Sequence, residues 1–268
     1  GRTTLNGEGL QHQDGHSMLL ASTNPAVVAY DPAYGFEVAF IVEDGLRRMY
    51  GPDSEDVFYY LSVYNEPYPQ PQMPDLPRLR EGVLRGLYRY SQSHAEGPRA
   101  QVLASGIAMR LAMDAQRILE QDWGVAIDVW SATSWNELRR DAIECEQHNL
   151  LYPGDERRTP YVTQALMSTT GPVIAVSDWM RAVPDQISRW VPNQWTSLGT
   201  DGFGRSDTRA SLRRHFHVDP ESIAVAVLIE LAHRGDVDAS LPAQAVERYR
   251  LRDEQLPPEK DTTEGGAE

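Results

Sequence analysis

The densest cluster of chemically active side chains lies near the start of the chain, in residues 6–17 (NGEGLQHQDGHS). Its glycines let backbone approach a ligand closely, and His12 and His16 stand four residues apart with Asp14 between them. Imidazole changes its protonation near neutral pH, so it suits proton transfer or hydrogen bonding to a substrate oxygen. The segment predicts either a catalytic or cofactor-lining loop or a surface loop with solvated histidines.

A metal site is the least favoured interpretation of this segment. The glycines favour a loop, in which the helical spacing of a zinc-binding histidine pair does not apply. No cysteine and no third clustered ligand stand nearby in the sequence. We therefore predict no metal ligand in residues 6–17 and assign none elsewhere in the chain.

A second glycine-rich segment, residues 199–206 (GTDGFGRS), follows a predicted strand and precedes a predicted helix. Phosphate-binding loops occupy the same place, but this segment lacks the Lys-Ser/Thr ending of a P-loop and the glycine spacing of a dinucleotide-binding loop. We interpret it as a structural turn. Cys145, flanked by Glu144 and Glu146, is predicted to be an unreactive thiol because neighbouring carboxylates oppose thiolate formation.

Composition excludes several classes of protein. The 268 residues include 25 Lys or Arg against 39 Asp or Glu, a formal net charge of −14, which argues against a surface for nucleic acid or anionic membrane. No apolar run approaches the roughly 20 residues of a membrane span. Cys145 is the sole cysteine, so no internal disulfide forms and a reducing compartment is allowed. We expect a cytoplasmic protein that binds neither nucleic acid nor membrane.

The first part of the chain predicts a strand, a helix and a strand. The strand covers residues 26–30, the helix 32–50 with Asp31 as its N-cap and Pro32 in its first turn, and the second strand 57–63. Residues 65–79 contain five prolines, which forbid helix and favour an extended connector. We place a domain boundary there, near Arg78.

Beyond that boundary, strands and helices alternate. Such alternation predicts an α/β domain with a mainly parallel sheet covered by helices on both faces. A capping-box pattern, Ser134 followed by Glu137, marks the start of one helix. The expected strands are 83–90, 101–105, 125–130, 172–177 and 195–198, and the expected helices are 107–121, 134–147, 179–191, 206–216, 220–234 and 242–249.

Three motifs together resemble one enzyme family. They are RTTLNGEGLQHQDGHS at residues 2–17, YDPAY at 30–34 and LGTDGFGRSD at 198–207. In this order and at these separations they resemble the homodimeric bacterial pyruvate dehydrogenase, the thiamine-diphosphate-dependent decarboxylating component of the pyruvate dehydrogenase complex. The resemblance covers only the C-terminal third of that enzyme, and because the chain begins without methionine we expect a piece of a longer protein.

The resemblance implies a fold for each part of the chain. Residues 1–78 would be the C-terminal part of a transketolase-like pyrimidine-binding domain. Residues 79–251 would be a transketolase C-terminal-like domain. Residues 252–268, with almost no apolar residue and many acidic ones, form an expected disordered tail.

The resemblance also implies chemistry. Thiamine diphosphate and magnesium would be the cofactors, and pyruvate would be decarboxylated oxidatively, with reductive acetylation of a lipoyl group on the dihydrolipoyl acetyltransferase component. The family forms homodimers, in which the histidine matching His12 lines the pocket beside the reacting carbon. His16 is a candidate contact to the cofactor. The diphosphate and magnesium motif belongs to sequence upstream of Gly1, so this chain alone is expected to be inactive.

Two other classes of function remain open on the sequence. Another thiamine-dependent enzyme, acting on a different 2-oxo acid or on a ketose phosphate, would keep the fold. It should show substrate-binding residues that differ from residues 6–17, the histidine loop. A non-catalytic α/β interaction module would leave His12 free to vary. The effect of a His12 substitution on function therefore distinguishes an enzyme from an interaction module.

Overall fold

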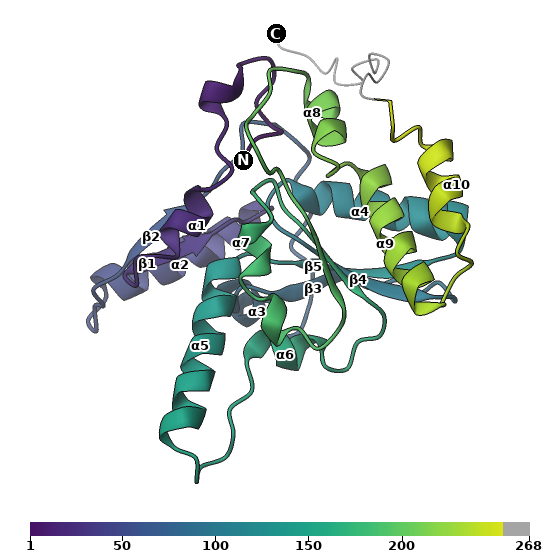
Figure 1. Cartoon of the computed structure of the whole chain (residues 1–268). Coiled ribbons are helices and arrows are strands. Elements are labelled where there is room, and N and C mark those ends of the chain that lie inside the picture. The colour runs from purple at the N-terminus through teal and green to yellow at the C-terminus, as the bar shows by residue number, and fades with distance from the viewer. Residues whose placement is uncertain (254–268) are drawn as a thin grey trace.

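The structure is a computed structural model that describes residues 1–253. Two β-sheets organise the molecule (Figure 1). The larger sheet has the strand order β3-β5-β4-β6-β7, and the smaller sheet pairs β1 with β2. The strands are β1 Val27–Tyr30, β2 Phe58–Leu61, β3 Tyr88–Ser91, β4 Arg99–Ala104, β5 Ala126–Ser131, β6 Val173–Val176 and β7 Trp195–Leu198. The predicted strands at 26–30, 57–63, 101–105, 125–130, 172–177 and 195–198 are thus confirmed.

The larger sheet is mainly parallel, as predicted. β4 lies at its centre, where Val102 is paired with Val129 of β5 on one side and with Ile174 of β6 on the other. β7 adds parallel to β6, whereas the edge strand β3 runs antiparallel to β5. Parallel strands need crossover connections, and the helices between these strands supply them.

Both faces of this sheet are covered. Val102, Val129 and Ile174 face a core shared with α4 and α9, whereas the alternate residues Leu103 and Ala175 face α5, α6 and α7. This alternation follows from the pleat of a strand. The helices are α1 Ser17–Ala21, α2 Gly35–Tyr50, α3 Leu79–Arg85, α4 Ala108–Ile118, α5 Trp135–Leu151, α6 Tyr161–Leu166, α7 Ala182–Asp185, α8 Arg209–His215, α9 Pro220–Arg234 and α10 Leu241–Arg248.

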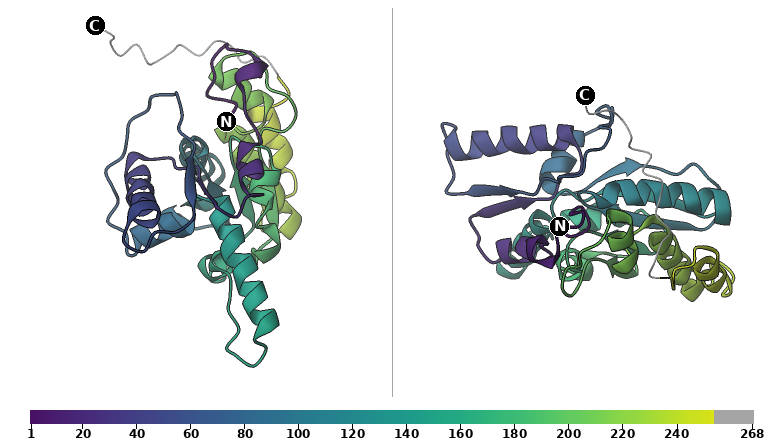
Figure 2. Two further views of the ribbon diagram at one scale, coloured as in Figure 1. Left: turned by 90° about the vertical axis from the view of Figure 1, so that its left-hand side faces the viewer. Right: turned by 90° about the horizontal axis from the view of Figure 1, so that it is seen from above.

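The smaller sheet and α2 form a layer beside the main body (Figure 2). β1 and β2 are parallel, and no ladder joins them to the five-stranded sheet within residues 1–253. Val28 of β1 and Ile41 of α2 nevertheless share a buried cluster with Val83 and Tyr88 from the following segment. The domain boundary near Arg78 stays a prediction, since packing is continuous across it.

The prediction of a strand over residues 83–90 is wrong. The segment instead forms the end of α3, a turn and β3. Gly86, with φ of 97°, terminates the helix in the left-handed conformation, and a Cβ there would lie 2.5 Å from the Ser134 carbonyl oxygen. Apolar residues on both sides of this glycine resemble one strand, but its backbone conformation divides them between two elements.

Two predicted helices also differ from the observed ones. α2 begins at Gly35 rather than at residue 32, because the Glu37 carboxylate accepts hydrogen bonds from the Ala33 and Tyr34 N–H groups at 2.6 and 3.0 Å and caps the helix there. The predicted helix at 179–191 is only the short α7 and a 3₁₀ turn, Ser188–Trp190. Pro184 lies within the first turn of α7, and the α-helix ends after Asp185.

The remaining helices lie close to their predicted places. The Ser134 hydroxyl accepts from the Glu137 N–H at 3.0 Å, which supplies one half of the predicted capping box at the start of α5. Neither α1 nor α6 is predicted from the sequence. No helix within residues 1–253 is both long and apolar enough to cross a membrane. Most of the predicted tail, residues 254–268, lies outside the described residues.

Candidate functional site

His12 lies at the surface of the molecule. It ends a 3₁₀ turn, Leu10–His12, and its side chain is exposed. Neither ring nitrogen forms a hydrogen bond to any residue in the part of the chain that the structure describes. The imidazole is therefore free to donate to, or accept from, a molecule bound against this loop.

The two glycine-rich segments singled out in the sequence lie side by side (Figure 1). The buried Gln13 side chain joins them, because its Nε2 donates to the Arg205 carbonyl oxygen at 2.7 Å and its Oε1 accepts from the Arg205 N–H at 3.0 Å. The Gly7 N–H also donates to the Asp207 carbonyl oxygen at 3.0 Å. Residues 199–206, predicted to be only a turn, thus support the histidine loop.

His16 stands at the other end of that loop, exposed at the start of α1. The Asp14 Oδ1 accepts from the His16 and Ser17 N–H groups at 2.9 and 3.0 Å, and lies 3.6 Å from His16 Nδ1. Partial burial works to raise the pKa of Asp14, but hydrogen bonds from Ser17 and the His16 N–H lower it below its usual value. Asp14 is therefore a carboxylate that fixes the backbone beneath His16.

The chain before the loop is held by a buried carboxylate, Asp178. Its two oxygens accept from the Thr3 N–H at 3.0 and 3.1 Å. Burial raises the pKa of Asp178 above its usual value. The adjacent Arg2 donates to the Thr200 carbonyl oxygen, and Met180 donates its N–H to the Gly15 carbonyl oxygen at 2.8 Å. Both ends of the histidine loop are thus anchored to segments that follow β6 and β7.

Asp31 is the centre of a polar cluster beneath these anchors. It was predicted to cap α2, but it is 1% exposed and accepts hydrogen bonds elsewhere. Its donors are Ser62 Oγ, Tyr64 OH at 2.5 Å, Ser105 Oγ at 2.6 Å and Trp179 Nε1 at 3.0 Å. The sequence held a signal for this role, because Asp31 directly follows a strand, where side chains of α/β proteins converge.

The described residues match only part of what a thiamine diphosphate and magnesium site requires. Within residues 1–253 no group of three or more His, Cys, Asp or Glu side chains is placed to hold a metal ion. The exposed imidazoles of His12 and His16, on one anchored loop, have the chemistry to meet a cofactor and its substrate. They fit one wall of such a site, so no magnesium-dependent step is assigned to this chain.

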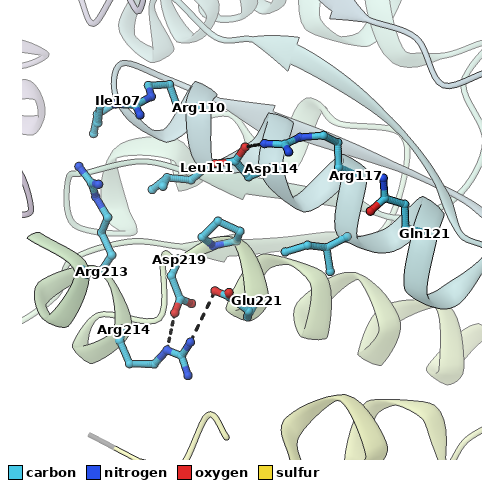
Figure 3. Close-up of a pocket in the computed structure, with 13 residues that line it drawn as sticks. Ile107, Arg110, Leu111, Asp114, Arg117, Gln121, Arg213, Arg214, Asp219 and Glu221 are labelled. Carbon is cyan, nitrogen blue, oxygen red and sulfur yellow. Dashed lines mark hydrogen bonds and ion pairs between the residues drawn. The ribbon is translucent and has the colours of Figure 1, made fainter. Parts of the chain in front are cut away.

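A cavity of about 420 Å³ lies between α4, α8 and the start of α9 (Figure 3). Arginines line it, but each guanidinium already faces a carboxylate. Arg214 faces Asp219 and Glu221, and Arg117 faces Asp114, as Figure 3 shows. The other two arginines, Arg110 and Arg213, pair with Glu66. The cavity therefore offers an anion little uncompensated positive charge.

Cys145 lies buried on α5, well away from the histidine loop in sequence and on the opposite side of the larger sheet from α4. Burial, followed by the nearby Asp141 charge, raises the pKa of its thiol. A raised thiol pKa lowers the thiolate fraction at neutral pH. The structure thus supports the prediction of an unreactive cysteine, with desolvation rather than the flanking glutamates as the main cause.

Two family models match the chain. Residues 1–71 match the middle domain of the pyruvate dehydrogenase E1 component. Residues 86–219 match the transketolase-like C-terminal domain. The predicted boundary near Arg78 falls in the interval between these two matches, although neither match defines the end of a folded unit.

Curated relatives extend the likeness over nearly the whole chain. The pyruvate dehydrogenase E1 component of Mycolicibacterium smegmatis is 58% identical over 254 residues, which are 94% of this chain and 27% of that protein. The same component of Mycobacterium tuberculosis is 56% identical over 268 residues, 99% of this chain and 28% of that protein. The component of Escherichia coli K12 is 44% identical over 259 residues, which are 96% of this chain and 29% of that protein. The chain thus spans under a third of the length of these relatives.

Solved structures share the fold. A transketolase of Pichia stipitis superposes with a TM-score of 0.61 at 19% identity, covering 87% of this chain and 29% of that one. A transketolase of Leishmania mexicana superposes with a TM-score of 0.59 at 16% identity, covering 96% of this chain and 30% of that one. These comparisons confirm the predicted transketolase-like fold and the resemblance stated from the three sequence motifs.

Proposed function

The chain belongs to the transketolase-like C-terminal domain family, and from this premise we propose that it is the C-terminal part of a pyruvate dehydrogenase E1 component. The reaction proposed is oxidative decarboxylation of pyruvate with reductive acetylation of a lipoyl group. The observation that supports it is the 58% and 56% identity to two E1 components along nearly the whole chain. Transketolase-like structures support only the fold, because their identity to the chain is low.

We assign the substrate-facing role to His12. Thiamine diphosphate, when bound, supplies the carbon nucleophile and the electron sink for decarboxylation. The His12 imidazole, with both nitrogens free of partners in residues 1–253, would hydrogen-bond the oxygen of the pyruvate carbonyl and hold or release a proton at that oxygen. Such general acid–base assistance contributes about 10²- to 10⁴-fold in rate.

The other parts of the proposal follow from the same premise. His16, held by Asp14, would contact the cofactor from the same loop. The diphosphate and magnesium site would lie in sequence that this chain does not contain, so the chain alone would be inactive. The full enzyme would be a cytoplasmic homodimer, with the lipoyl-bearing dihydrolipoyl acetyltransferase as its partner.

The test is steady-state kinetics of His12→Ala in the full-length protein that carries this chain, at saturating thiamine diphosphate and magnesium. Turnover of pyruvate should fall by one to several powers of ten, or about 1.4 kcal/mol of transition-state stabilisation per tenfold. Cofactor affinity should change much less. His233→Ala, an exposed histidine on α9, is the matched control and should leave turnover unchanged.

Two results would contradict the proposal. Wild-type turnover in a folded His12→Ala enzyme would remove His12 from the reaction and favour a solvated loop histidine. Turnover of a ketose phosphate in place of pyruvate would assign the chain to a transketolase-like enzyme. An equal loss in His16→Ala would instead show that the loop as a whole shapes the site.

A further inference from the structure

We propose that Gln13 is a positioning residue that fixes His12 by clamping the histidine loop onto residues 199–206. This inference rests on the proposed function of His12. Gln13 is the residue next to His12, and its side chain points away from the surface into the contact between the two loops. Its partner, Arg205, is 192 residues away in the sequence.

The Gln13 side-chain amide pairs with the backbone of Arg205 as a second backbone strand would. A glutamine side chain ends in a primary amide, which offers a donor and an acceptor side by side. Gln13 uses both on one residue, donating to the Arg205 carbonyl oxygen at 2.7 Å and accepting from the Arg205 N–H at 3.0 Å. Only 9% of Gln13 is exposed, so water competes poorly for these groups. Two hydrogen bonds to one residue restrict both the distance and the rotation of the loop.

Gly204 lets the two loops approach this closely. A Cβ added at Gly204 would lie 2.4 Å from Gln13 Oε1 and 2.9 Å from Gln13 Cβ. Both distances are well below van der Waals contact, so a larger residue at 204 must displace the amide. In the sequence this glycine resembles an ordinary turn residue, whereas in the structure the close packing of Gln13 explains why a glycine is needed at position 204.

Residues 199–206 are a firm support because their beginning is tied to the sheet. Gly199 directly follows β7, and the Thr200 N–H donates to the Trp179 carbonyl oxygen at 2.9 Å. Trp179 in turn donates its indole N–H to the buried Asp31. Displacement of residues 199–206 would break these hydrogen bonds in the core. The contact between Gln13 and Arg205 therefore holds the histidine loop in a fixed position relative to the sheet.

The loop has few other restraints near His12. Residues 8–12 are exposed or half-exposed, and the His12 N–H makes only a local bond, to the Gly9 carbonyl oxygen at 3.4 Å. The next firm anchors lie at Gly7, bonded to Asp207, and at Gly15, bonded to Met180. Between them, Gln13 is the residue whose side chain bonds both its donor and its acceptor to another segment. A misplacement of about 1 Å in a reacting group can cost about 10²-fold in rate.

The experiment uses the full-length holoenzyme with Gln13→Met, which keeps the length of the side chain but removes both hydrogen bonds. We expect turnover to fall 10- to 100-fold (about 10²-fold for a 1 Å shift), while the KM for pyruvate and the affinity for thiamine diphosphate change less than about threefold. Gln147→Met is the matched control, because Gln147 is exposed on α5, outside residues 6–17, and it should keep wild-type turnover. Gly204→Ala should reproduce the Gln13→Met loss, and the double variant should be no worse than either single one, because both break one contact.

Amide hydrogen exchange supplies a readout that does not depend on activity. The Arg205 N–H should exchange slowly in the wild type and at least tenfold faster in Gln13→Met and Gly204→Ala. Unchanged Arg205 exchange in both variants would overturn the clamp. Faster exchange with wild-type turnover, while His12→Ala is impaired, would overturn the positioning role. If His12→Ala itself keeps wild-type turnover, the proposed function fails and the positioning role falls with it, whereas the exchange data still decide whether the clamp exists.

Discussion

Substitution of Asp31 should weaken the fold more than substitution of any exposed carboxylate, because four donors converge on it. One carboxylate oxygen accepts from Ser62 and Tyr64, and the other accepts from Ser105 and Trp179. The three hydroxyls can rotate to become acceptors, but an indole N–H can only donate. An asparagine at position 31 would therefore turn its oxygen toward Trp179 and its NH₂ group toward the two hydroxyls on the other side.

The magnitude follows from these donors. Hydrogen bonds to a charged group contribute about 1.5–3 kcal/mol each and neutral ones about 0.5–1.5, so Asp31→Asn should cost about 2 kcal/mol after rotation of the hydroxyls. Asp31→Leu removes every acceptor and leaves the buried Trp179 N–H unpaired, at about 1–3 kcal/mol for each unsatisfied group. We expect a total above about 4 kcal/mol, which is exceptional for one substitution.

Urea unfolding followed by circular dichroism measures these changes in the free energy of unfolding. Asp53→Asn, on an exposed turn, is the control and should stay within about 0.5 kcal/mol of the wild type. Trp179→Phe should destabilise the wild type but partly restore Asp31→Leu, since it deletes the unpaired N–H. Strictly additive effects of these two substitutions, or an Asp31→Asn chain as stable as the wild type, would refute the reasoning.

Two further predictions concern the region of α8 to α10. Arg214→Ala should cost about 3–5 kcal/mol in the free energy of unfolding, because it leaves the Asp219 carboxylate buried without its partner. Arg117→Ala, which breaks an exposed pair in the same cavity, should cost no more than about 1 kcal/mol, and equal losses would contradict this. Burial raises the pKa of Tyr249 to about 12, above the value of about 10 in the unfolded chain. The folded state thus holds the phenolic proton more tightly, so this contribution to stability is complete below pH 10 and is lost as the pH rises through 12. Denaturant midpoints across this range should fall less steeply in Tyr249→Phe than in the wild type, and parallel curves would count against the assignment.

The sequence predicted most elements of the larger sheet because their signals are local. β4 and β5 are mostly apolar and β6 is wholly apolar, which is typical of parallel strands buried on both faces. The helices that have a proline in their first turn, α9 and α10, also carry their own start signals. The failures have a different origin. At residues 83–90, one glycine divides a segment whose overall composition suggests a single element. Residues 179–191 form the short α7 and a 3₁₀ turn, although their composition suggests one helix.

The histidine loop shows the same limit for a functional site. Its residue types marked it in the sequence, and His12 and His16 stay predictions as catalytic and cofactor-contacting residues. The support for the loop could not be predicted, because Gln13 and Arg205 are far apart in the sequence and a glutamine among polar neighbours resembles any exposed residue. The burial of Gln13 depends on residues 199–206, which lie far from it in the sequence. A local sequence pattern therefore cannot predict this burial.

The placement of the loop follows from the direction of the strands. Asp31 directly follows β1, Ser62 follows β2 and Ser105 follows β4, while Trp179 comes shortly after β6. Their hydrogen bonds to Asp31 therefore bring the carboxyl ends of strands from both sheets to one point. In open α/β sheets, ligands bind outside the carboxyl ends of the strands. The residue after Trp179 binds the backbone of the histidine loop, so the loop is anchored at the edge where a ligand site is expected, and its position depends on both sheets rather than on either one alone.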